Sequence, residues 1–186
     1  MLDPTGPEYA LADDLHPLLE FTRTLVTHEH RKRIHKVAPS ATIAWCDPKR
    51  ALSQVADNEE TTNLQATSEW NVTGLARFQE YGLRFYLAGE PAFWYASDDL
   101  TPEEVICHTL SLTTDSRRVG YSMLLIEQEE ITQNDLMETA AWYGLESIVE
   151  QMYRLINGDH DTTEEMSRPM PSGQEYADLK KQYGVV

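Results

Sequence analysis

Residues 101–127 read TPEEVICHTLSLTTDSRRVGYSMLLIE, and this stretch decides how the second half of the chain folds. It opens with a capping box, in which Thr101 can accept a hydrogen bond from the backbone of Glu104 and Pro102 takes the first helical position. Apolar residues then recur at helical spacing through Leu112, and again over 116–127. The sequence therefore predicts two consecutive helices at the start of a helical C-terminal half.

Toward the C-terminus the same signals continue. A third helix is predicted after Thr132 and ends at Gly144, and a fourth covers 145–156. We assign 101–158 to a helical subdomain and the polar residues 159–171 to a mobile linker. Residues 172–186 begin with a second capping box and are predicted to form a terminal helix.

Toward the N-terminus the signals are mixed. We assign residues 1–12 to the remnant of a wing-like strand and 13–100 to an α+β core. The predicted elements of this core are a helix from Leu15 to Val37, a strand over 41–46, an Asp47-capped helix, a polar linker over 57–63, a strand over 66–72, a short helix over 73–81, and a hairpin of 83–87 with 92–96. The predicted fold class is α+β, a small mixed sheet packed by helices and followed by the helical subdomain.

The charges are segregated along the chain. The sequence has 31 acidic and 15 basic residues and a net charge of −16, yet residues 21–50 carry +5, which leaves −21 for the rest. Carboxylates spread over the whole chain are typical of proteins adapted to molar potassium chloride. The N-terminus lacks an export signal and no apolar run is long enough to span a membrane, so we expect a cytoplasmic protein without membrane contact.

The basic stretch is the candidate nucleic-acid contact, because an acidic body repels phosphates elsewhere. The candidate residues are Arg23, Arg31, Lys32, Arg33 and Lys36. Three histidines, His28, His30 and His35, lie in the same stretch. Their spacing does not place a metal-binding set on one helical face, so we interpret them as a solvated or polyanion-contacting cluster.

No catalytic signature is present, and we expect no metal, no cofactor and no catalytic residue. A nucleotidyltransferase would need two carboxylates alternating along a strand after its glycine turn. Here Gly74 is followed, in the next predicted strand, by Arg84 and Tyr86. Cys46 and Cys107 are far apart and read as buried apolar residues. The aromatic residues around 85–95 favour core packing, with a ligand cleft as the alternative.

Five segments carry a resemblance that covers most of the chain. They are GPEYALADDLHPLLEF (6–21), VAPSATIAWCDP (37–48), NVTGLARFQEYGL (71–83), DLTPEEVICHTLSLTTDSRRVGYSMLLI (99–126) and MPSGQEYADLKKQYGVV (170–186). Together they resemble the region downstream of the winged helix in haloarchaeal helix-turn-helix transcriptional regulators. That resemblance implies a C-terminal domain lacking most of the DNA-reading module. More distantly, VTGLARFQEYG and TPEEVICHTL resemble toxin–antitoxin proteins of the AbiE type, whose toxin is a nucleotidyltransferase.

These observations favour a non-catalytic regulatory or accessory domain of a transcription-regulator-like protein. It would act through protein contacts, with a protein partner or as a homodimer, and through weak DNA contacts of the basic stretch. Two alternatives stay open, a nucleotidyltransferase-like component of a toxin–antitoxin system and a pure protein-interaction module.

Folding is expected to depend on salt. Self-repulsion among the −16 net charges is strongest at low ionic strength, because the Debye length grows from about 3 Å at 1 M to about 10 Å at 0.1 M salt. Thermal unfolding followed by circular dichroism should give a midpoint that rises with potassium chloride. A midpoint that stays constant between about 0.1 M and about 3 M would contradict the salt-adapted interpretation.

Overall fold

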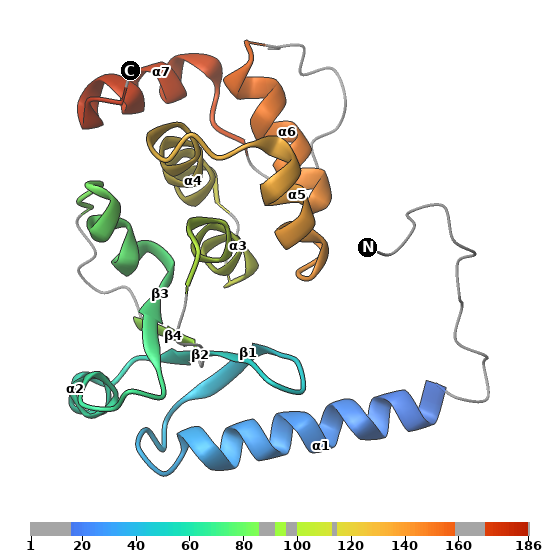
Figure 1. Ribbon diagram of the computed structural model, residues 1–186. Coiled ribbons are helices and arrows are strands. Elements are labelled where there is room, and N and C mark those ends of the chain that lie inside the picture. Colours follow the sequence, from blue (N-terminus) through green and yellow to red (C-terminus); the bar gives the residue numbers. More distant parts are fainter. Residues whose placement is uncertain (1–15, 86–91, 96–99, 113–114, 159–169, 186) are drawn as a thin grey trace.

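The computed structural model describes residues 16–85, 92–95, 100–112, 115–158 and 170–185. It is an α+β structure in which a small sheet lies between the long helix α1 and a group of C-terminal helices (Figure 1). The N-terminal elements are α1 (His16–Ile34), β1 (Thr42–Cys46), β2 (Ala51–Val55) and α2 (Asn58–Gln65). They are followed by β3 (Asn71–Thr73), the 3₁₀ helix η2 (Gly74–Tyr81) and β4 (Ala92–Tyr95).

The C-terminal half consists of α3 (Pro102–Leu112), α4 (Ser116–Gln128), α5 (Gln133–Ala141), α6 (Glu146–Ile156) and α7 (Gly173–Tyr183). The two predicted capping boxes are confirmed. The Thr101 hydroxyl accepts from the Glu104 backbone N–H at 3.3 Å while the Glu104 carboxylate accepts from the Thr101 N–H at 3.3 Å. Ser172 and Glu175 form the same reciprocal pair at the start of α7. The helical C-terminal half is thus confirmed.

The sheet has the strand order β1-β2-β4-β3. All three strand pairs are antiparallel, so the prediction of a mixed sheet is wrong for the described strands. The predicted hairpin of 83–87 with 92–96 is also wrong within the described residues, because β4 pairs with β2 and β3. Leu83 instead enters the helical core, where it is 2% exposed. Residues 1–12 and most of the predicted linker, 159–169, lie outside the described residues.

Two short elements differ from the sequence-based expectation. The segment after Asp47 is the strand β2, not a helix, because the Asp47 carboxylate accepts from the backbone N–H groups of Lys49 and Arg50 at 2.7 and 2.6 Å and closes a turn between β1 and β2. The polar segment 57–63 is not a linker. It forms most of α2, whose N-cap Asp57 accepts from the Glu60 N–H at 2.9 Å and whose Leu64 is fully buried.

A bulge in β1 sends the side chains of Ile43 and Trp45 to opposite faces of the sheet. Ile43 lies opposite Ser53 and Trp45 lies opposite Leu52, so Ala44 is an extra residue in the ladder. Because of this residue, Ile43 packs into the core beneath the sheet with Ile34 of α1, while the Trp45 ring reaches Tyr143 of the helical half, with centroids 4.7 Å apart. Without the bulge, Ile43 and Trp45 would point to the same face.

The described residues form two hydrophobic cores. The smaller one lies between the sheet, α1 and α2 and includes Ile34, Val55, Leu64 and Trp70. The larger one fills the C-terminal half and includes fully buried residues such as Ile106, Leu124 and Leu136. Helix α7 closes this core against Gly120 of α4, where a Cβ atom would lie 2.7 Å from the Leu179 side chain. A glycine at position 120 therefore permits the close approach of α7.

His108 joins the sheet to the helical half. Its ring is fully buried, and its Nδ1 and Nε2 atoms lie 2.8 Å from the Thr73 hydroxyl and 2.9 Å from the Tyr143 hydroxyl. One ring nitrogen of a neutral imidazole donates and the other accepts, so both hydroxyls are satisfied. Burial, helped by the nearby positive charge of Arg50, lowers the pKa of His108 to about 3. The ring is therefore neutral near pH 7.

Arg50 forms a second contact between the two parts. Its guanidinium pairs with Asp47 at 2.8 Å and with Glu104 at the start of α3 at 3.3 Å. The same group lies over the rings of Trp45 and Trp142, at 5.7 and 5.8 Å from their centroids. The β1–β2 turn is thus fastened to the first turn of α3 by an ion pair and to the end of α5 by a cation–π contact.

Thr101→Ala is expected to lower the free energy of unfolding by about 0.5–2 kcal/mol, because the first turn of α3 loses its side-chain cap. Chemical unfolding in high salt measures the change. A variant as stable as the native chain would mean that the cap contributes nothing to α3.

The buried His108 should also make stability fall in mild acid. Its pKa in the folded state, about 3, is below the 6.5 of an exposed histidine, so the unfolded chain binds the proton first. The stabilisation from neutral His108 is complete above pH 6.5 and is lost as the pH falls from there, by up to about 1.4 kcal/mol per pH unit.

His108→Gln is expected to be less stable at neutral pH but to lose stability less steeply between pH 6.5 and about 5, above the range in which most carboxylates titrate. Denaturant unfolding of both chains at a series of pH values gives the two slopes. Parallel slopes would contradict the assignment of a buried neutral imidazole.

Candidate nucleic-acid interface

Helix α1 carries all the predicted nucleic-acid residues except Lys36, which follows its C-terminal end. Its inner face is fixed to the sheet by Ile34, which is fully buried. The N-terminal part of the helix runs past the sheet and away from the rest of the molecule (Figure 1). The candidate surface is therefore presented by a helix that is attached at one end.

Two of the three clustered histidines have a structural role. A ring nitrogen of His30 lies 2.8 Å from the Asp47 carbonyl oxygen, and one of His35 lies 2.9 Å from the Ala41 carbonyl oxygen. His30 is only 7% exposed. His30 is therefore not solvated, contrary to what the sequence had suggested, and His30 and His35 tie the end of α1 to both ends of β1. Only His28 is exposed.

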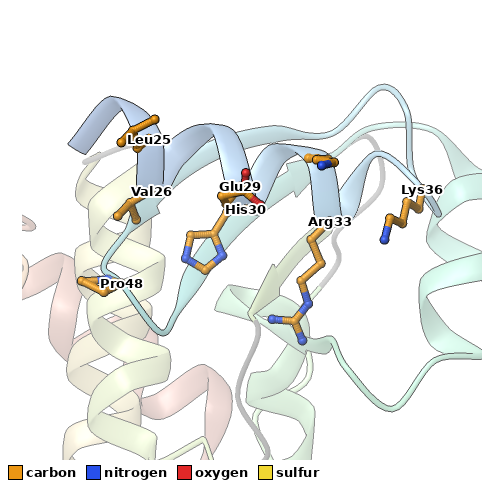
Figure 2. Close-up of a pocket in the computed structure, with 8 residues that line it drawn as sticks. Leu25, Val26, Glu29, His30, Arg33, Lys36 and Pro48 are labelled. Carbon is orange, nitrogen blue, oxygen red and sulfur yellow. The ribbon is translucent and has the colours of Figure 1, made fainter. Parts of the chain in front are cut away.

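The five candidate cations fall into two groups. Lys32, Arg33 and Lys36 line one open groove of about 540 Å³ along α1 (Figure 2). The other residues of this groove are Leu25, Val26, Glu29, His30 and Pro48. Arg23 and Arg31 line a separate recess of about 300 Å³ with Thr24, Thr27 and His28. The helical repeat of 100° per residue separates the two groups.

The cations also differ in what they already contact. Arg33 pairs with Glu69 at 3.0 Å and lies over the Trp70 ring, and Arg23 pairs with Glu20 at 3.0 Å. Both ion pairs are well exposed, so each contributes little to stability. Within the described residues, Arg31, Lys32 and Lys36 have no carboxylate at salt-bridge distance. These three exposed cations are available to an external anion.

A second effect favours cations at this end of α1. Arg31, Lys32 and Arg33 occupy its last turn, where the helix dipole places partial negative charge on the unpaired carbonyl groups. Each cation there stabilises the helix by typically 0.3–1 kcal/mol. Part of the local concentration of positive charge is therefore explained by helix stability alone.

Arg50, at the end of the basic stretch, does not belong to this surface. It is held by Asp47, Glu104 and two tryptophan rings at the junction of the two halves. From the sequence alone, the charge of Arg50 was included in the +5 of residues 21–50. The sequence also gave no sign that Pro48, in the β1–β2 turn, lines the groove together with α1.

The other residues considered from the sequence lie in packed surroundings. Phe85 stacks on Tyr121 with centroids 3.8 Å apart, and Arg118 pairs with Asp115 at 2.6 Å. Cys107 is buried, and its pKa is raised by burial. In the described parts of the chain, no three His, Cys, Asp or Glu side chains are grouped so that they could hold a metal ion. No described helix has the length and apolar character needed to cross a membrane.

The comparisons with known proteins concern mainly the C-terminal half. Residues 67–185 match the family model described as HVO_2833_C, C-terminal. The match covers more than half of the chain, so the protein belongs to this haloarchaeal family. No curated protein and no solved structure is detectably similar to it. Helix α1 and its groove precede the matched region.

Proposed function

We propose that this protein is a non-catalytic regulatory domain that contacts the phosphate backbone of DNA weakly through the groove of Lys32, Arg33 and Lys36. The observation that carries the proposal is the exposed basic groove on a helix that extends from a strongly acidic body. Polyanions are repelled by most of such a surface, so a cationic groove directs them to one place. The resemblance to the region downstream of a winged helix supports a role beside DNA.

The geometry limits the strength of this contact. Three cations share one groove, and one of them, Arg33, is already paired with Glu69. Phosphate contacts position a protein without reading sequence, which requires contacts to base edges. We therefore expect weak binding that does not depend on DNA sequence, and a partner or further domain would have to supply the sequence specificity.

The test is a titration of fluorescently labelled duplex DNA at several potassium chloride concentrations. With three phosphates neutralised, the logarithm of affinity should fall with the logarithm of salt with a slope of about −2.7. The variant with Lys32→Gln, Arg33→Gln and Lys36→Gln should lose most of the binding and nearly all of this slope. Changing Arg23→Gln and Arg31→Gln, which lie in the separate recess, should have a smaller effect.

A charge-matched control removes three exposed cations elsewhere, by Arg84→Gln, Arg154→Gln and Lys181→Gln. Its net charge equals that of the groove variant, so a difference between the two cannot come from overall charge. Equal binding by the native chain and the groove variant would overturn the proposal. So would the absence of binding at the lowest salt that keeps the protein folded.

A second candidate function, a pure protein-interaction module, is favoured by another observation on the same helix. Leu18, Phe21 and Leu25 are 61%, 59% and 49% exposed, although each is large and apolar. Exposed apolar clusters on soluble proteins commonly mark contact surfaces. If the titration above detects no DNA binding, a protein-interaction role would better explain the exposed surface of α1.

A further inference from the structure

We propose that two copies of the chain associate through the outer face of α1, with their helices antiparallel. The contact would be made by Leu18, Phe21 and Leu25, called here the apolar stripe. These residues are spaced by three and four positions, which is the spacing of a seam between two packed helices. The stripe is the one cluster of large exposed apolar side chains among the described residues, since the fourth such residue, Trp142, lies on its own after α5.

The stripe points away from the rest of the molecule. Leu25 and the fully buried Ile34 are nine residues apart, which corresponds to about 900°, or half a turn beyond two full turns. Because Ile34 faces the sheet, Leu25 and the residues in line with it face outward. A second helix can therefore approach the stripe without meeting the sheet or the C-terminal helices.

Charge favours a second copy as the occupant. Two chains of −16 each repel one another over most of their surfaces. Residues 16–25 carry only Glu20 and Arg23, which pair with each other at 3.0 Å, so this segment has no net charge. The stripe is thus a neutral apolar patch through which two acidic copies can touch with little repulsion. Since the same patch serves on both copies, the contact is self-complementary, as two-fold symmetry requires.

The antiparallel direction follows from the cations at the end of α1. Parallel helices would place Arg31 and Lys32 of both copies beside each other. In an antiparallel pair with Leu18 facing Leu25 of the other copy, the two basic ends point apart. Their centres would then lie about 35 Å from each other at a rise of 1.5 Å per residue.

The contact is small. Three partly exposed side chains from each copy bury far less than the roughly 800 Å² per partner of a standard interface. The dimer should therefore form only at high protein concentration. Salt should strengthen it, because screening removes the repulsion between the two acidic bodies, whereas salt weakens any phosphate contact.

Sedimentation velocity over a wide range of protein concentration, at low and high potassium chloride, tests the association. We expect the native mass to rise from one chain of 21.3 kDa toward two, and to do so more readily at high salt. Leu18→Gln with Phe21→Gln should keep the chain monomeric without changing its thermal unfolding, because both side chains are exposed and neither lines the basic groove. Trp142→Gln, which removes an exposed apolar side chain elsewhere, should dimerise like the native chain.

Cysteine cross-linking tests the direction of the helices, in a Cys46→Ser background that removes the partly exposed native thiol. A mixture of Leu18→Cys and Leu25→Cys chains should cross-link, and each chain alone should not. Cross-linking of each variant with itself would overturn the antiparallel arrangement. A native chain that remains monomeric at every concentration and salt would overturn the dimer and assign the stripe to a different partner. Because DNA binding is measured separately, failure of either proposal can be recognised independently.

Discussion

The buried imidazole of His108 is the contact on which the arrangement of the molecule depends. It belongs to α3, yet its two nitrogens satisfy hydroxyl groups from the end of β3 and from the turn between α5 and α6. A buried polar group without a partner costs roughly 1–3 kcal/mol, and moving the sheet away from the helices would take this contact from the Thr73 hydroxyl and from the ring nitrogen of His108 that faces it. The sheet and the helical half are therefore held in one relative position by a hydrogen-bond chain as well as by packing.

The position of α1 follows from the same region. His30 of α1 contacts the Asp47 carbonyl group, the Asp47 carboxylate pairs with Arg50, and Arg50 pairs with Glu104 in the first turn of α3. These contacts between four residues connect α1, which bears the basic groove, to α3, which bears His108. The attached end of α1 is consequently fixed relative to the C-terminal half, and its basic groove has a defined direction.

Features that depend on neighbouring residues, such as helix caps, could be predicted from the sequence. Features that depend on contacts between distant segments could not. Capping boxes at Thr101 and Ser172 mark helices because the signal lies within four residues. Asp47 was predicted to cap a helix but closes a turn, and Asp57 was predicted to lie in a linker but caps a helix. The same side chain can cap a helix or close a turn, so the residue type alone does not decide between them. For the candidate site, the sequence supplied the cations but neither their division into two groups nor the wall formed by Pro48. Nothing in the neighbouring sequence indicates that Glu69 holds Arg33, because the two residues are 36 positions apart.

The sheet also determines how the family region relates to the preceding residues. The family match begins at residue 67 and so includes β3 and β4 but neither β1 nor β2. Yet β4 lies in the interior of the sheet, with β3 on one side and β2 on the other. Without β2, one edge of β4 would present unpaired N–H and C=O groups, which favours aggregation. Residues 51–55 therefore complete the sheet of the family region, and α1, packed on β1 and the same small core, is held to that region by the sheet itself.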